Sequence, residues 1–447
     1  MFEWTPAQDG MYQLTHAVYV NGVQVGETLT ATFVKGVAPR GCDWSTGTIE
    51  LGWYADAKSL NAITYSVYWS ESDDPASCRR TDRLVGTKVF APSKIGVQEL
   101  TISDDEYLAH GDGLKPIYYH VVGTDGSWSY CKTRNRYGVV AAISSYEDTW
   151  QKSMPNAAGQ ANDFATEFAQ SCETSQNVKL LTNSVVSKDN YRNTVSNIAL
   201  VAKAGDVFVS YLYSHGGSDP NQDGASIIAF YRKNTGYYAP EMAADMAAFD
   251  AGVGFVGILY NCHAAEFVDP DADTSKWLAG TALAACTKNR AWIAASGAEV
   301  TTPQDIFGWF LTEAGWKSGW ADATWEDEWK GDTSLVTFGA LARYTKQRMH
   351  DLIGAELHSE PEIFDDFKML DNVVAGKRGS HPDMGAPQMP SISVSSDGSA
   401  LGVNLNWSAD AVADGYVLYW HAPLSTKYAF EQYAATSFSA HKDSVAG

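Results

Sequence analysis

"DVFVSYLYSHGGSDPNQDG", residues 206–224, begins as a continuous, mostly apolar run and then breaks into Ser-His-Gly-Gly. An apolar run of this length that ends at glycines is typical of a strand buried on both faces. The glycines let backbone N–H groups approach a ligand closely, and a strand end is where a rigid scaffold presents side chains to a cleft. The stretch therefore predicts a buried strand with a functional histidine, His215, at its end.

Three further apolar runs resemble this strand, and helical patterns separate them. The runs are "YGVVAAIS" (137–144), "VGFVGILYN" (253–261) and "RAWIAAS" (290–296), and the helical patterns include 162–172 and 190–204. Apolar strands that alternate with helices indicate a three-layer α/β domain with a mostly parallel sheet covered on both faces. In such sheets ligands bind at the carboxyl ends of the strands.

Two reactive side chains follow neighbouring strands of this predicted sheet. His215 ends the strand of residues 206–214, and Cys262 ends the strand of residues 253–261, 47 residues further on. A cysteine thiolate is a strong nucleophile, and a histidine is the side chain that accepts a proton near neutral pH. The N–H groups of Gly216 and Cys262 are candidates to bind the oxyanion of a tetrahedral intermediate. These residues predict nucleophilic catalysis.

The motifs around these residues resemble those of the caspase-like cysteine peptidases, and of metacaspases in particular. The matching stretches are "YLYSHGGSD", "YNCHAA", "VVAAISSYED", "PNAAGQANDFATEF", "AASGAEVTTPQDIFGWFLTEAGW" and "EPEIF", and they cover about residues 139–370. The resemblance implies peptide-bond hydrolysis through a thioacyl-enzyme, with Cys262 as nucleophile, His215 as acid and base, and Gly216 at the oxyanion. It implies no required cofactor, and a protein or peptide substrate.

The chain departs from the metacaspase pattern at two positions near the nucleophile. Metacaspases usually carry an aspartate two residues before the catalytic cysteine, where it helps to bind a basic P1 side chain, whereas this chain has Tyr260. Asp163 matches the second acidic position of that pocket. Ala265 replaces a glycine of the family motif. Tyr260 and Asp163 are therefore the predicted substrate-binding residues, and a preference for Arg or Lys at P1 does not follow.

The chain on both sides of this domain has the pattern of all-β sandwiches of the immunoglobulin or fibronectin type III kind. Short alternating segments with a central tryptophan, Trp53 or Trp407, occur in both flanks and resemble fibronectin type III modules. The predicted organisation is the end of a preceding β-rich domain (1–36), a sandwich (37–136), the peptidase domain (137–372), a linker (373–388) and a partial module (389–447). Intramolecular or cell-surface contacts of the sandwiches are expected.

Composition narrows the classes of partner. The chain has 447 residues and a net charge of −21, which repels phosphate backbones and argues against a nucleic-acid partner. No apolar run of about 18 residues predicts a membrane-spanning helix. The chain begins as if inside a domain, so a missing signal peptide does not exclude the extracellular or bacterial cell-surface location that the flanking modules suggest.

Calcium and disulfides are weaker expectations. Asp219, Asn221 and Asp223 follow the opening of a calcium-binding loop, but Phe230 stands where the bidentate glutamate belongs. A disulfide among Cys42, Cys78 and Cys131 would fit a secreted protein. Cys172 and Cys286 are interpreted as small buried hydrophobes, and His263 as a loop-stabilising residue.

Two alternatives to a peptidase remain open. A caspase-like scaffold or adhesion protein without activity would explain Tyr260 and Ala265, and an esterase or transferase would use the same thiol.

Overall fold

The computed structural model describes residues 10–16, 19–20, 23–24, 29–55, 61–74, 76, 83–91, 98–219, 225–233, 235–268, 288–297, 302, 305–325, 334–353, 360–380, 392–396, 403–407, 415–420, 429–434 and 439–442. None of the helices in these ranges is long and apolar enough to cross a membrane.

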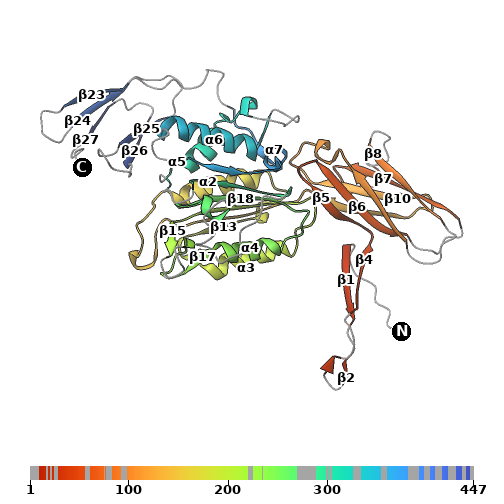
Figure 1. The fold of residues 1–447 in the computed structure, drawn as a ribbon. Helices are drawn as coiled ribbons and strands as arrows, with labels where there is room; N and C mark the ends of the chain where they lie inside the picture. The colour runs from red at the N-terminus through yellow and green to blue at the C-terminus, as the bar shows by residue number, and fades with distance from the viewer. Residues whose placement is uncertain are drawn as a thin grey trace.

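A six-stranded sheet lies at the centre of the molecule (Figure 1). In sheet order its strands are β13 (Val178–Thr182), β12 (Arg136–Ala142), β14 (Val207–Tyr213), β18 (Gly254–Tyr260), β19 (Arg290–Ala294) and β21 (Glu362–Phe364). Neighbours run parallel from β13 to β19, and β21 is antiparallel to β19. Every residue of β14 and β18 is buried, which explains their continuous apolar sequence.

Helices cover both faces of this sheet (Figure 1). One face carries α2 (Ala157–Gln170), α5 (Ile306–Gly308), the π-helical segment η9 (Trp309–Lys317) and α6 (Phe338–Ile353), and the other carries α3 (Lys188–Ala199) and α4 (Ala239–Ala247). Helix α2 buries Phe164 and Phe168, four positions apart on one side. Helix α3 begins at Ser187, whose side chain accepts the N–H of Asn190. The predicted covering of both faces is confirmed.

The four strands predicted from apolar runs are confirmed, each to within two residues at either end. Strands β13 and β21, at the two edges, were not predicted as strands. Strand β13 has exposed and buried residues in no clear alternation, so the chain carries no period-two signal there. Strand β21 has only three residues, all half-buried.

Residues 37–133 form two antiparallel sheets. One contains β5 (Val37–Asp43), β6 (Thr48–Ala55) and β9 (Gln98–Asp104); the other contains β8 (Leu84–Phe90), β7 (Ile63–Ser70), β10 (Ile117–Gly123) and β11 (Trp128–Thr133). Trp53 of the first sheet meets Tyr65 of the second edge to face, with ring centroids 5.9 Å apart. Both rings are buried, so the sheets share one core, and the predicted core role of Trp53 is confirmed. The assignment to the fibronectin type III class stays a prediction.

This two-sheet unit docks on the amino-terminal edge of the central sheet. The Tyr107 hydroxyl donates to the carbonyl of Gly205, just before β14, at 2.6 Å. The backbone N–H of Trp44 donates to the Asn289 side chain, just before β19, at 2.8 Å. Buried residues of both units belong to one hydrophobic cluster. Docking at this edge leaves the carboxyl edge of the sheet to other segments.

The remaining described elements are short. The amino-terminal part contains β1 (Gly10–His16), β2 (Tyr19–Val20), β3 (Val23–Gln24) and β4 (Leu29–Lys35), and the carboxyl-terminal part contains β23 (Ile392–Ser396), β24 (Val403–Trp407), β25 (Gly415–Trp420), β26 (Ala429–Ala434) and β27 (Ser439–Lys442). Between them lie β15 (Gly216–Asp219), β16 (Ala225–Ala229), β17 (Gly236–Tyr238), β20 (Leu335–Thr337), β22 (Val374–Lys377) and α7 (Met369–Asn372). Trp407 is buried, as expected.

Strands β15 and β16, before and after the predicted calcium-binding residues, pair antiparallel from Gly216↔Ile228 to Asp219↔Ala225. The disulfide expectation needs correction. Cys42 and Cys131 are both free thiols, so they do not form a disulfide with each other. Cys78 lies outside the described residues, as does Cys286.

Candidate active site

His215 and Cys262 lie at the same edge of the central sheet. Strands β14 and β18 are paired up to Tyr213↔Tyr260, and the ladder continues with the Ser214 N–H, which donates to the Tyr260 carbonyl at 3.2 Å. His215 and Cys262 each follow two residues after the last paired residue of their strand. Because neighbouring strands are about 4.8 Å apart, the backbone segments that carry the two residues leave the sheet next to each other.

Tyr146 packs against the His215 ring and interacts electrostatically with Cys262. Its ring stacks on the His215 imidazole with centroids 5.4 Å apart, and its hydroxyl accepts the His215 backbone N–H at 2.9 Å. Burial raises the pKa of Tyr146 to about 12, and the negative charge of a Cys262 thiolate adds to this rise. Tyr146 therefore lies within electrostatic reach of the sulfur. Sequence reasoning missed it, because one tyrosine in a loop carries no local signal.

The hydrogen bonds of His215 determine which ring nitrogen can act as a base. Nε2 lies 2.8 Å from the backbone carbonyl oxygen of Lys152. A carbonyl oxygen only accepts hydrogen bonds, so Nε2 carries the proton and Nδ1 is the unprotonated nitrogen of the neutral ring. Burial lowers the pKa of His215. At neutral pH the imidazole is therefore mainly neutral, which is the state that a general base requires.

Cys262 is half-buried. Burial raises the pKa of the thiol. The backbone N–H groups of Thr302 and Gly216, which face the sulfur, offset part of this rise. At neutral pH the resting state is therefore mainly the protonated thiol beside a neutral imidazole.

Gly216 is packed directly against the residue that it would assist. A Cβ atom at position 216 would lie 2.1 Å from the carbonyl oxygen of Cys262 and 2.6 Å from the side-chain nitrogen of Asn261. No side chain fits at these distances, so the position requires glycine. The Gly216 N–H faces the Cys262 sulfur and helps to offset the rise of the thiol pKa.

The structure does not place the two predicted substrate-binding residues on an open surface together. Tyr260 is 1% exposed and stacks on Tyr213 with centroids 3.7 Å apart. Asp163 is half-exposed on α2, and its charge acts on Glu167 and Lys317. In this structure Tyr260 thus packs beneath the strand ends, because aromatic neighbours cover both sides of its ring, and its contact with substrate stays a prediction.

Asp305 is a buried carboxylate that sequence reasoning missed. It begins α5 with a left-handed φ of 68°, and it is 4% exposed. Its carboxylate accepts the Tyr213 hydroxyl at 2.9 Å and the Asn156 side-chain amide at 2.9 Å, and its carbonyl accepts the Gln160 side chain at 2.7 Å. Burial raises the pKa of Asp305. The residue therefore ties the end of β14 to the first turn of α2.

The contacts of Asp305 also involve the loop before α2, which forms a hydrogen bond with the histidine. Asn156, which donates to Asp305, is four residues after Lys152, the residue whose carbonyl accepts from His215. The loop is also held at Met154, whose N–H donates to the Ser144 carbonyl at 2.8 Å. Asp305 and His215 are thus both hydrogen-bonded to the loop before α2, at Asn156 and Lys152.

No metal site is found among the residues that the structure describes: no three of their His, Cys, Asp and Glu side chains converge. Asn221 and Asp223 lie outside the described residues. Asp219 ends β15, and its side chain is not described either. His263 has a left-handed φ of 58°, and its Nδ1 lies 3.7 Å from the buried Glu266 carboxylate; its predicted loop-stabilising role stays a prediction.

Comparisons with known proteins add little. The chain matches no family model and no curated protein. Among solved structures, the protein GSU0716 of Geobacter sulfurreducens aligns with a TM-score of 0.39 and 15% identity over 52% of this chain and 92% of its own. Caspase-1 from Spodoptera frugiperda aligns with a TM-score of 0.34 and 12% identity over 56% of this chain and 93% of its own. These TM-scores are too low to carry an argument, so the proposals below rest on the chain itself.

Proposed function

We propose that this protein is a caspase-like cysteine peptidase that hydrolyses peptide bonds through a thioacyl-enzyme. The observation that carries the proposal is the placement of His215 and Cys262 just after two adjacent parallel strands, with Nε2 of the histidine held by the Lys152 carbonyl. This arrangement leaves Nδ1 as the only ring nitrogen able to accept a proton. The sequence motifs around both residues support the same assignment.

The first half of the reaction forms the thioester. His215 Nδ1 takes the thiol proton while the Cys262 sulfur attacks the substrate carbonyl carbon, and the carbonyl electron pair moves to oxygen. The N–H groups of Gly216 and Cys262 bind the resulting oxyanion, each contributing about 3–4 kcal/mol in comparable sites. When the intermediate collapses, His215 gives its proton to the leaving amine as the C–N bond breaks.

The second half regenerates the enzyme. His215 accepts a proton from water as the water oxygen attacks the thioester, and the C–S bond then breaks to release the carboxylic acid. The sulfur leaves as thiolate and regains the proton from His215. Because the resting pair is neutral, proton transfer accompanies the attack of the sulfur and does not precede it.

Labelling with a peptide electrophile tests this proposal. We expect a peptidyl acyloxymethyl ketone to modify the wild type at Cys262 and to leave Cys262→Ala unmodified, with Cys172→Ala as the matched thiol control. Equal labelling of wild type and Cys262→Ala would refute the peptidase assignment.

His215→Ala should fold and lose turnover by roughly 10²-fold or more, because a general base contributes that much.

The substrate preference at P1 forms part of the same proposal. Asp163 and Tyr260 are the proposed contributors to the pocket, and the loss of the aspartate before Cys262 favours a P1 side chain other than Arg or Lys. Profiling with a peptide library tests this preference directly. A strict requirement for Arg or Lys would contradict it.

An inactive caspase-like scaffold is the second candidate, because burial raises the pKa of the Cys262 thiol and so lowers its reactivity. A folded wild type that neither cleaves a peptide library nor takes up the electrophile would favour the scaffold. The extracellular or cell-surface location and the flanking fibronectin type III-like modules belong to the proposal in either case.

A further inference from the structure

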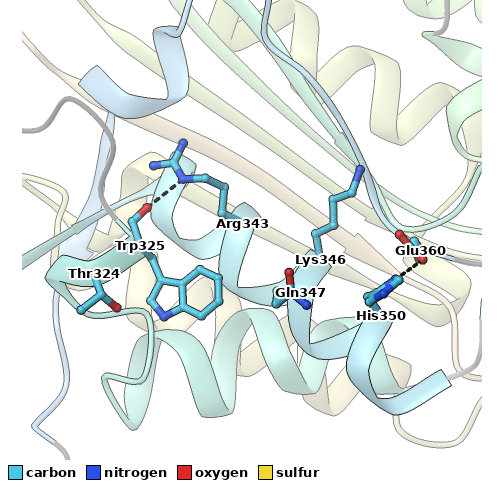
Figure 2. A pocket seen from close by; sticks show the side chains of 7 residues that line it. All are labelled: Thr324, Trp325, Arg343, Lys346, Gln347, His350 and Glu360. Carbon is cyan, nitrogen blue, oxygen red and sulfur yellow. Dashed lines mark hydrogen bonds and ion pairs between the residues drawn. The ribbon is translucent and has the colours of Figure 1, made fainter. Parts of the chain in front are cut away.

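A cavity lies along α6. Its volume is about 490 Å³, which is within the range of small-molecule sites. Figure 2 shows the side chains that line it: Thr324, Trp325, Arg343, Lys346, Gln347, His350 and Glu360. None of these residues takes part in the proposed peptidase chemistry.

The cavity follows one face of helix α6. Arg343, Lys346 or Gln347, and His350 are spaced as i, i+3 or i+4, and i+7, so they share that face. Seven residues of helix correspond to about 10 Å of length. Trp325, from the short helix η10 (Ala323–Trp325), and Glu360, just before β21, line the cavity with this face.

The lining is positively charged, although the whole chain carries a net charge of −21. Arg343 is already neutralised, because it pairs with the Asp371 carboxylate at 2.6 Å, and its Nε donates to the Trp325 carbonyl at 2.7 Å. Lys346 makes no hydrogen bond or ion pair with any other described residue. Among the described residues of the lining, its ammonium group is therefore the charge that no carboxylate pairs with.

The His350 end of the cavity offers a further donor. His350 Nδ1 lies 2.5 Å from the Glu360 carboxylate, as the dashed line in Figure 2 marks. The Glu360 carboxylate raises the pKa of His350. When the ring is protonated, its Nε2–H is a second hydrogen-bond donor on the face that carries Lys346.

Trp325 adds a flat apolar wall. Its indole is partly exposed, and it meets the Tyr344 ring edge to face with centroids 5.5 Å apart. The hydrogen bond from Arg343 Nε holds the Trp325 backbone in place. An indole held in this way can pack against an aromatic ring of a ligand.

We propose that this cavity binds a small organic anion, whose carboxylate or phosphate group pairs with Lys346 and whose ring packs on Trp325. A single carboxylate or phosphate matches the Lys346 ammonium group, which no described residue of the lining pairs with. The negative field of the whole chain repels polyanions, and the cavity volume suits a molecule of drug-like size or smaller.

Calorimetric titration with simple probes tests the proposal. Benzoate and phenyl phosphate should bind with dissociation constants of roughly millimolar order, and more tightly than phenol or inorganic phosphate, which each lack one half of the recognised chemistry. If benzoate binds more tightly than phenyl phosphate, the ligand carries a carboxylate. If phenyl phosphate binds more tightly, the ligand carries a phosphate. Heats no larger for these probes than for phenol would overturn the proposal.

Variants separate this site from the rest of the protein. Lys346→Gln should weaken both anions by about tenfold, because a charged hydrogen bond is lost, and Trp325→Ala should weaken the ring-bearing anions while leaving inorganic phosphate unchanged. Lys179→Gln, an exposed lysine on β13, is the matched control and should bind like the wild type. Unchanged binding by Lys346→Gln would refute the site.

Cys262→Ala should bind both anions like the wild type. If the peptidase proposal fails, the proposed anion site can therefore still be tested.

Discussion

At the scale of single residues, the notable property of this site is that its two reactive groups are both neutral at rest. Burial lowers the pKa of His215 and raises that of Cys262. The pair therefore differs from a preformed thiolate–imidazolium ion pair, because low polarity disfavours both charges. Reactivity of the thiol should consequently depend on pH in a way that an ion pair would not.

We expect the alkylation rate of Cys262 by iodoacetamide to keep rising up to the ordinary thiol pKa of 9.0 and beyond it. The thiolate is the reactive form, and its fraction grows about tenfold per pH unit below the thiol pKa. Mass spectrometry of the Cys262 peptide follows the reaction separately from that of the other half-buried thiols, Cys131 and Cys172. A rate that levels off near neutral pH would show that Cys262 and His215 form a thiolate–imidazolium ion pair.

Two adjacent glycines provide a matched pair of substitutions. Gly216→Ala places a Cβ 2.1 Å from the Cys262 carbonyl oxygen, so we expect turnover to be abolished and stability to fall by about 1–3 kcal/mol. Gly217→Ala has nothing within 4 Å of the added atom and should behave like the wild type. Peptide hydrolysis and urea unfolding measure the two effects. Similar activity in both variants would argue against a role for the Gly216 N–H.

At the scale of elements, the site depends on how loops connect strand ends to helices. Asp305 joins β14 and α2 through Tyr213 and Asn156, and the loop before α2 supplies the carbonyl that orients His215. None of these contacts lies within a single element. The positions of β14, α2 and α5 relative to one another therefore determine where the imidazole points.

Asp305 should make stability depend on pH. Burial raises its folded pKa above the ordinary value of 3.8, so above pH 3.8 the native state binds more protons than the unfolded state. The contribution of Asp305 to the free energy of unfolding should therefore decrease as pH rises from 3.8 through the raised pKa, and be constant beyond it. Asp305→Asn removes this contribution. Because an amide nitrogen donates where a carboxylate oxygen accepts, the substitution costs about 1–3 kcal/mol above the raised pKa, where the ionised carboxylate accepts from Tyr213 and Asn156.

Urea unfolding of wild type and Asp305→Asn at several pH values between 3.8 and 7 measures the difference between their slopes. Asp163→Asn, at a half-exposed position on α2, serves as a control and should retain the slope of the wild type. Identical slopes in the wild type and Asp305→Asn would contradict the prediction.

At the scale of the whole molecule, the first β unit and the α/β unit are joined by a buried junction. Trp44 is 2% exposed, and its indole N–H donates to the Gly252 carbonyl, just before β18, at 3.3 Å. Asn372, from the end of α7, donates to the Trp44 carbonyl at 2.8 Å. The junction supports the sheet at the edge opposite to His215 and Cys262.

Disruption of this junction should destabilise both units together. We expect Trp44→Ala to lower stability by about 3–5 kcal/mol, the usual cost of removing a buried tryptophan. Scanning calorimetry should show one transition for residues of both units, shifted to lower temperature. Trp128→Ala, at a 41% exposed position on β11, should shift it much less. Two separate transitions in the wild type would show that the units unfold independently.

Local pattern was sufficient to predict the central strands and the two residues that follow them. The four apolar runs predicted their strands because a strand buried on both faces requires an apolar residue at every position. The alternation with helices predicted a parallel sheet, in which the ends of the strands before His215 and Cys262 lie at one edge. These features depend on residues that are close together in the chain.

The contacts that only the tertiary structure decides are all between residues distant in the chain. They include the carbonyl of Lys152 on His215, the buried link from Asp305 to Tyr213, the stacking that buries Tyr260, and the junction at Trp44. Their partners lie tens to hundreds of residues away, and neither periodicity nor spacing encodes which ones meet. The sequence by itself thus determined which reactive side chains, His215 and Cys262, follow the strand ends. Packing decided the protonation and orientation of these side chains.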